Sequence, residues 1–228
     1  MEPKKEYKRL AEKMRLQGLT YSEILKSLPV SKSSLSLWLH SITLSTNNKA
    51  RIETLKLAGQ KAGAKMRHQN RIDQQNTLIA TTQKEISKLI KDPFFTFGLS
   101  LYWAEGSKQK PWRLSGNVGF TNSDPQTILI MRMWLHKYSQ ITEDNTIYRL
   151  CIHKSADIKK ATKEWAFILG VDEQKILLSI KNHETKNGRH PNQEYRGLVH
   201  MRIRKSTWLN RKIALWSEFT AKNFLVNT

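Results

Sequence analysis

The stretch GLSLYWAEGSK, residues 98–108, decides the fold that the sequence predicts. It extends an apolar run that begins after Pro93, and this pattern predicts a buried helix. The helix ends in one acid, Glu105, which is followed by a Gly-Ser turn and the lysines Lys108 and Lys110. A carboxylate in this place either binds a cation or pairs with a neighbouring lysine. The alternative interpretation is a core helix whose last turn reaches solvent.

The segments around this helix predict an α+β domain. Asp92-Pro93 starts the helix, because proline is favoured in the first helical turn after a capping residue. Downstream we expect a hairpin of strands 108–114 and 117–122, a helix from Asp124-Pro125 to about Tyr138, a strand 146–153, a helix 156–169, a strand near 176–180, a strand around 199–204 and a last helix capped by Ser206 or Thr207.

Two of these strands alternate between apolar and basic residues. In residues 199–204, valine, methionine and isoleucine share one face, and His200, Arg202 and Arg204 share the other. In residues 146–153, Arg149 and His153 lie opposite the large apolar side chains. A sheet with apolar residues inward and cations outward is suited to a polyanion. The alternative is a solvated sheet face.

The N-terminal segment predicts three helices, at about residues 4–17, 21–28 and 32–39. Thr20 and Glu23 form a capping box, and Ser31 caps the third helix. This order is typical of a helix-turn-helix, with a small core of Ile24, Leu28, Val30, Leu35 and Trp38. On the outward side of the third helix we expect Lys32, Ser33, Ser34, Ser36 and Leu37 to face the major groove. A packing module without a DNA role is the alternative.

Residues 49–91 contain neither proline nor an aromatic residue, and they predict one or two long helices after a polar linker. Ile72, Ile79 and Ile86 recur every seven residues, which indicates a coiled-coil or docking seam. We therefore divide the chain into a helix-turn-helix domain (1–42), a basic helical linker (43–92) and an α+β domain (93–228).

Composition limits the function classes. The 228 residues carry a formal charge of +20, which points to DNA, RNA or an anionic membrane as partner. Residues 1–92 hold 18 basic and 8 acidic side chains and the remainder 21 and 11, so both halves are suited to nucleic acid. The apolar runs are too short for a membrane span. The single cysteine, Cys151, suits a reducing cytoplasm, and we expect it to be a small core residue.

The motif at residues 98–106 resembles the signature helix of the LAGLIDADG homing endonucleases. The family's metal-binding acid falls on Glu105 and its closing glycine on Gly106, whereas Trp103 departs from the small or acidic residue usual there. The runs GFTNSDP (119–125) and RGLVHMRIRKSTWLNRKIALW (196–216) resemble a bacterial and phage group that joins a helix-turn-helix to a degenerate copy of this domain. The resemblance implies an αββαββα domain whose curved antiparallel sheet lies in the major groove. It also implies side-by-side pairing of two such helices, for which Ser100 and Ala104 are small enough.

Two functions from different classes follow. The first is a sequence-specific double-stranded DNA-binding protein, regulatory or linked to a mobile element. Trp103 favours this function, because it departs from the motif of the cleaving family. The second is a homodimeric, Mg²⁺-dependent DNA endonuclease, in which Glu105 of each copy binds the metal and Lys108 and Lys110 stabilise developing negative charge. The dimer would form through the 98–106 helix or through the isoleucine seam. Without cleavage no cofactor is expected. The residues expected to contact DNA are Lys32, Ser33, Ser34, Ser36, Leu37, Lys108, Lys110, Arg149, His153, His200, Arg202 and Arg204.

Overall fold

The computed structural model of the protein describes residues 3–108, 116–182 and 195–226, and it confirms the α+β class. The chain forms two compact units, residues 1–74 and 75–228. The boundary falls inside one long helix, α4 (Thr46–Leu89), so the segment that we assigned to a separate linker contributes to both units. Each unit has its own hydrophobic core.

The first unit contains the three predicted helices, α1 (Pro3–Leu16), α2 (Tyr21–Ser27) and α3 (Lys32–Leu39). The capping box is present: the backbone N–H of Glu23 donates to Thr20 Oγ1 at 3.2 Å, and that of Thr20 donates to the Glu23 carboxylate at 2.7 Å. Ser31 caps α3 with its side chain, because Ser31 Oγ accepts a hydrogen bond from the backbone N–H of Ser34 at 3.1 Å. The core consists of Ala11, Ile24, Leu28, Leu35 and Leu39, with Val30 and Trp38 packed at its edge.

The start of α4 belongs to this first unit. The Asn48 amide donates to the Leu16 carbonyl at 2.8 Å, and Arg51 pairs with Glu23 at 2.8 Å. The hydrogen bonds from Arg51 and Thr20 lower the pKa of Glu23 to about 2. We predicted a polar linker up to about residue 48, but α4 begins at Thr46. The polar residues that suggested a linker cap the helix instead, because the Asn48 N–H donates to Ser45 Oγ at 3.3 Å.

The second unit contains a four-stranded sheet in the order β1-β4-β2-β3. Its strands are β1 (Gly119–Asn122), β2 (Thr146–His153), β3 (Ile176–Lys181) and β4 (Leu198–Ile203). The prediction of a fully antiparallel sheet is wrong, because β2 and β3 pair in parallel. A helix connects β2 to β3, and such a crossover returns the chain in its original direction. The predicted strand 108–114 lies almost entirely outside the described residues.

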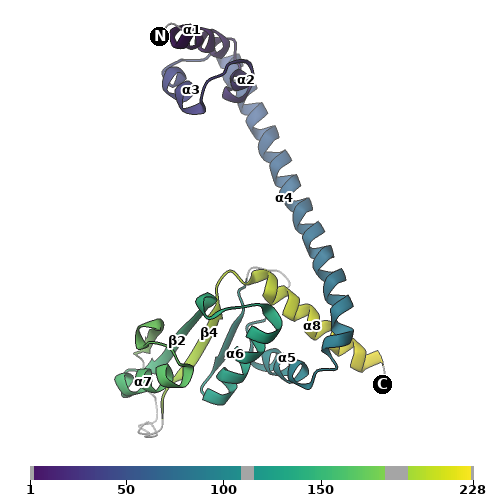
Figure 1. Ribbon diagram of the computed structural model, residues 1–228. Helices are drawn as coiled ribbons and strands as arrows, with labels where there is room; N and C mark the ends of the chain where they lie inside the picture. Colours follow the sequence, from purple (N-terminus) through teal and green to yellow (C-terminus); the bar gives the residue numbers. More distant parts are fainter. Residues whose placement is uncertain (1–2, 109–115, 183–194, 227–228) are drawn as a thin grey trace. The chain divides into compact units, whose positions relative to one another are not determined.

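Four helices complete the second unit: α5 (Pro93–Glu105), α6 (Pro125–Ser139), α7 (Ile158–Leu169) and α8 (Thr207–Val226). Short 3-10 turns, Glu143–Asn145 and Glu173–Lys175, precede β2 and β3. In Figure 1, α6 and α7 lie beside strands β2 and β4. One face of the sheet is buried with these helices in a single core. Among the described residues, no helix combines the length and apolar composition needed to cross a bilayer.

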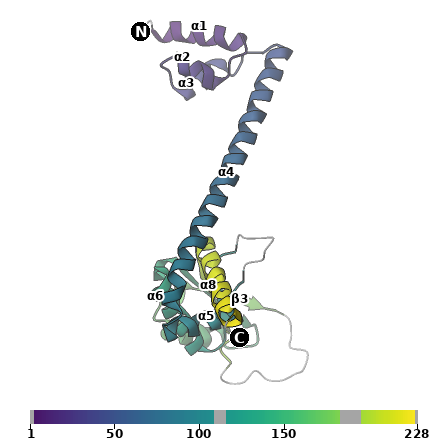
Figure 2. The ribbon, with the colours of Figure 1, turned by 90° about the vertical axis from the view of Figure 1, so that its right-hand side faces the viewer.

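The C-terminal end of α4 packs against α8 within the second unit, and Figure 2 shows the two helices side by side. The Glu85 carboxylate accepts a hydrogen bond from Trp216 Nε1 at 2.8 Å and pairs with Lys212 at 2.9 Å. Ile86 is only 5% exposed and belongs to the core of the unit. The isoleucine seam therefore cannot serve as a continuous dimer surface, because its last residue is used within the chain.

Helix α5 approaches α6 closely at Gly98. A Cβ at this position would lie 2.2 Å from Trp134 Cδ1, so only glycine leaves space for the indole. The Trp134 N–H donates to the Phe95 carbonyl at 3.0 Å, one turn earlier on α5. The rings of Phe95 and Trp216 complete this cluster, with centroids 5.2 Å apart. Helix α5 is thus fixed to α6 and α8 by aromatic packing.

Replacing Gly98 by alanine tests this packing. We expect Gly98→Ala to lower the free energy of unfolding by about 1–3 kcal/mol or more, since the methyl group overpacks the Trp134 site. Urea unfolding followed by tryptophan fluorescence measures the loss. Gly59→Ala is the control, because a Cβ at Gly59 on α4 meets nothing within 4 Å and alanine is the better helix former. Equal stability of Gly98→Ala and wild type would contradict the packing described.

Candidate nucleic-acid interface

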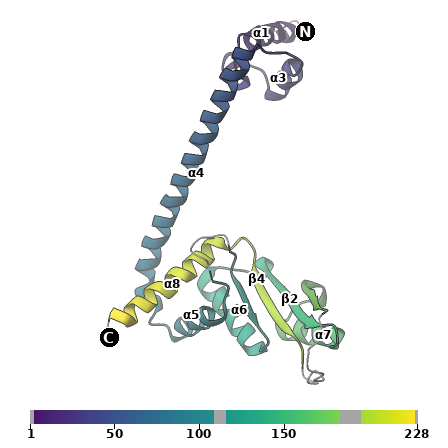
Figure 3. The ribbon, with the colours of Figure 1, turned by 180° about the vertical axis from the view of Figure 1, so that it is seen from behind.

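The sheet face opposite the helical core carries four of the predicted residues, Arg149, His153, His200 and Arg202. Tyr148, Leu150, Val199 and Met201 point into the core, so their neighbours in sequence point outward. Arg149 on β2 lies directly opposite His200 on β4. Arg202 lies opposite Gly119 of β1 on one side and Ile147 of β2 on the other. Strands β2 and β4, seen from behind in Figure 3, therefore bring residues about 50 positions apart in the sequence into one surface.

His200 lies at the centre of this face and is held in a defined orientation. Its Nδ1 is 2.7 Å from the hydroxyl of Thr121 on β1. A Cβ on Gly119 would lie 3.1 Å from His200 Cε1, so the glycine leaves space for the ring. Burial, and then the charges of Arg149 and Arg202, lower the pKa of His200. The imidazole is therefore neutral at pH 7 and is placed between two permanent cations.

Of the remaining predicted residues, His153 lies on this face, whereas Arg204 follows the end of β4 in a turn. Arg149, Arg202 and Arg204 are exposed, and His153 is half-buried. Arg204 donates to the Asp144 carbonyl at 3.0 Å, which holds its guanidinium beside the short helical turn that precedes β2. Sequence reasoning missed Lys181, which lies opposite His153 on β3. Residues 176–181 show no apolar–polar alternation, so no pattern indicated which face Lys181 occupies.

The prediction that Cys151 is a core residue is wrong. Cys151 lies between Arg149 and His153 on the outward face of β2 and is partly exposed. Its neighbours Leu150 and Ile152 are the residues that enter the core. A cysteine is small and weakly polar, so its identity alone did not indicate its face, although its place in the alternation did.

No outward position of the four described strands carries a carboxylate. The outward residues are Gly119, Thr121, Ile147, Arg149, Cys151, His153, Leu177, Ser179, Lys181, Leu198, His200 and Arg202. A surface that serves only solubility usually mixes both signs of charge. The positive charge on this face is therefore not neutralised by acids within the sheet, which favours an anionic partner.

Helix α3 presents most of the predicted contact residues of the first unit. Lys32, Ser33, Ser36 and Leu37 are exposed, and Leu37 keeps 71% of its surface. Ser34 is partly buried, and its hydroxyl lies 2.9 Å from that of the capping residue Ser31. Ser34 therefore supports the helix start, and the outward surface consists of the other four residues.

The turn that follows α5 and leads to Lys108 adjoins the sheet at β1, where Gly106 bridges to Phe120 and the Ser107 N–H donates to the Gly119 carbonyl at 2.8 Å. Glu105 is exposed at the end of α5 and has no hydrogen bond or ion pair within the described part of the chain. Residues 3–108, 116–182 and 195–226 contain no group of three or more metal-binding side chains. Lys110 lies outside the described residues. One copy of the chain thus offers a single carboxylate at this helix end.

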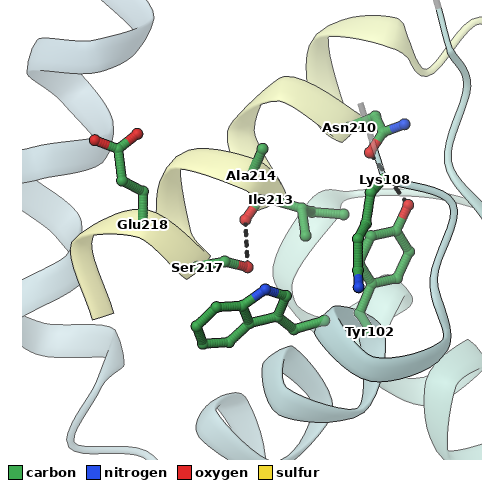
Figure 4. Close-up of a pocket in the computed structure, with 8 residues that line it drawn as sticks. Tyr102, Lys108, Asn210, Ile213, Ala214, Ser217 and Glu218 are labelled. Atoms are coloured by element: carbon green, nitrogen blue, oxygen red, sulfur yellow. Dashed lines mark hydrogen bonds between the residues drawn. The ribbon is translucent and has the colours of Figure 1, made fainter. Parts of the chain in front are cut away.

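Lys108 lines a pocket of about 280 Å³ between the end of α5 and α8. Figure 4 shows its side chain alongside the ring of Tyr102. Two polar side chains of this pocket are already hydrogen-bonded: the Tyr102 hydroxyl donates to Asn210 at 3.2 Å, and the Asn210 amide donates to the carbonyls of Ser107, Gly116 and Asn117. Burial raises the pKa of Tyr102. These hydrogen bonds fasten the turn after α5 to α8, which is a structural role.

The outer face of α5 is apolar although it lies on the surface. Phe97 and Trp103 are 55% and 49% exposed. Ser100 and Ala104, the two small residues, are exposed between them, and Leu101 is partly exposed. Trp103 also lines the pocket shared with α8, and Glu105 lies at the end of the helix.

Comparison of the chain with family models, with curated proteins and with solved structures found no match.

The His200 environment predicts a pH dependence of stability. The folded-state pKa of His200 lies below its unfolded value of about 6.5, so the unfolded chain binds the proton first as the pH falls. We therefore expect the free energy of unfolding to decrease as the pH falls through the unfolded-state pKa of about 6.5, and to decrease less in His200→Gln. Urea unfolding at a series of pH values measures both slopes. Identical slopes for the two proteins would contradict the environment described.

Proposed function

We propose that the protein is a sequence-specific double-stranded DNA-binding protein of regulatory or mobile-element type. The observation that carries this proposal is the outward sheet face, where Arg149, His200 and Arg202 adjoin one another without a carboxylate on any described strand. Arginine side chains on such a face neutralise phosphates and release their counterions, which provides most of the affinity of DNA-binding proteins. The resemblance of residues 98–106 and 196–216 to the LAGLIDADG group supports the same partner.

A second surface, on helix α3, supports the sequence-specific part of the proposal. Phosphate contacts fix position on the duplex, whereas groove contacts read the sequence. The exposed side of α3 carries short hydroxyl side chains, which allow a helix backbone to approach the base edges closely. The cap at Ser31 and the buried Leu35 and Leu39 hold this helix firmly in its unit.

Duplex DNA is a better match than single-stranded RNA. Common RNA-binding sheets stack unpaired bases on exposed aromatic residues. None of the outward positions of the four described strands carries phenylalanine, tyrosine or tryptophan. The outward face offers cations and hydroxyls instead, which suit the phosphate backbone of a double helix.

The apolar outer face of α5 favours a second candidate, a homodimeric Mg²⁺-dependent endonuclease. If two copies paired along Ser100 and Ala104, their Glu105 carboxylates would meet at the helix ends. Two carboxylates and the scissile phosphates would then provide enough oxygen ligands for Mg²⁺. Lys108 lines the pocket beside α8. Its side chain would therefore have to leave this pocket to contribute to cleavage.

Charge removal on the sheet tests the main proposal. We expect Arg149→Ala/Arg202→Ala to weaken duplex binding roughly 30-fold at about 0.15 M salt, and to reduce the slope of log affinity against log salt by about 2. Both values correspond to one phosphate contact for each arginine. Fluorescence anisotropy with labelled duplex measures both quantities. Lys159→Ala/Lys163→Ala is the matched control, because it removes the same charge from exposed positions on α7, away from this face.

The single cysteine locates the bound DNA independently. Duplex should slow the alkylation of Cys151 by a maleimide, as measured by intact mass, and it should fail to do so in the Arg149→Ala/Arg202→Ala variant. If both double variants lost the same affinity, or if Cys151 reacted equally fast with and without bound DNA, the sheet would not be the DNA-binding surface.

The second candidate predicts cleavage that depends on Glu105. Wild-type protein with Mg²⁺ should nick a supercoiled plasmid that carries a selected binding site, and Glu105→Gln should abolish nicking without loss of binding. Glu53→Gln is the control, because Glu53 is an exposed acid on α4 in the other unit. Absence of nicking by wild type, or equal nicking by Glu105→Gln, would remove this candidate and leave the DNA-binding proposal in place.

A further inference from the structure

The exposed side of α3 has a defined chemical composition. Ser33, Ser36, Leu37 and His40 are exposed at helical spacing and form one stripe. Leu37 is the only apolar residue of the stripe and is 71% exposed. His40 Nδ1 lies 2.9 Å from the Leu37 carbonyl, so the histidine closes the end of the helix.

Leu37 does not contribute to the core of its unit. The core of this unit consists of five residues that are each 5% exposed or less, and Leu37 is not among them. A single exposed leucine needs no explanation in general. Leu37 differs because it lies in the middle of the helix face that would enter the major groove. Residues 1–74 around it carry 15 basic and 6 acidic side chains, so an anionic partner is the occupant that the charge favours.

We propose that Leu37 reads the C5 methyl group of thymine, a conclusion that rests on the proposed DNA-binding function. The thymine methyl is the only apolar group on the major-groove edges of the four base pairs. A leucine placed against any other base edge would remove water from hydrogen-bonding groups without replacing it. Leu37 therefore selects thymine by packing and discriminates against the other bases by desolvation.

The other residues of the stripe further restrict the DNA sequence that α3 would prefer. The stripe contains no arginine, lysine, asparagine or glutamine, the side chains that form bidentate bonds with guanine or adenine, whereas the exposed Lys32 lies outside the stripe in the first turn of α3. Ser33 and Ser36 accept or donate single hydrogen bonds and discriminate weakly. Within the part of the half-site that the stripe contacts, a thymine methyl group thus provides the main discrimination.

The test uses the full chain and duplexes selected from random sequence. Each thymine of the selected site is replaced in turn by uracil, which keeps Watson–Crick pairing and removes only the methyl group. We expect one position at which wild-type protein binds the uracil duplex about fourfold more weakly, the value of one buried methyl group. In Leu37→Ala the thymine and uracil duplexes should bind equally at that position.

Leu16→Ala is the matched control, because Leu16 on α1 is 58% exposed and does not lie on α3. This variant should keep the wild-type preference for thymine over uracil. Circular dichroism shows whether each variant is folded, and Leu37→Ser provides a second variant with the same expected loss of preference. The inference is overturned if no uracil substitution weakens wild-type binding, if Leu37→Ala keeps the preference, or if the selected half-site lacks thymine. If the proposed DNA-binding function is wrong, the result is different, because the wild-type protein then does not bind duplex DNA at all.

Discussion

The close approach of α5 and α6 at Gly98 is the constraint on which the second unit depends. The missing side chain admits the Trp134 indole, and the indole N–H bonds to the Phe95 carbonyl of the same helix. Phe95 also contacts Trp216 of α8, and Trp216 in turn donates to Glu85 of α4. One glycine thus permits an aromatic cluster that joins four helices, and these helices provide the support for one face of the sheet.

Because one sheet face is fully used by this packing, the other face is available for a different chemistry. The alternation of strands β2 and β4 places apolar side chains inward and arginine or histidine side chains outward. His200 shows the electrostatic consequence, since two neighbouring arginines help to keep its imidazole neutral. Concentrating cations on one face costs self-repulsion in the free protein. An anionic partner that neutralises Arg149 and Arg202 would relieve this repulsion, which is the physical basis of the proposed function.

The two units offer different surfaces for the proposed binding of DNA. The first is a three-helix unit of small core, and its stability depends on caps at Thr20 and Ser31 and on the ion pair between Glu23 and Arg51. Its exposed helix face is nearly uncharged and suits base edges. The second has a large core and an exposed sheet rich in arginine, which suits phosphates. The division matches the general separation between contacts that position a protein on DNA and contacts that read its sequence.

The sequence by itself determined the features that depend on short-range chemistry. Caps at Thr20, Ser31, Asp92 and Asp124 and the stop at Gly170 fixed helix ends, because each acts on backbone groups within a few residues. The period-two pattern of residues 146–153 and 199–203 likewise fixed which side chains face outward. Interactions with distant partners depend on the tertiary structure: the parallel pairing of β2 with β3, the burial of Ile86 and the presence of Lys181 beside the outward residues of β2. These could not be predicted, because strand order and helix docking are set by which surfaces meet across the fold, and no local pattern encodes that choice.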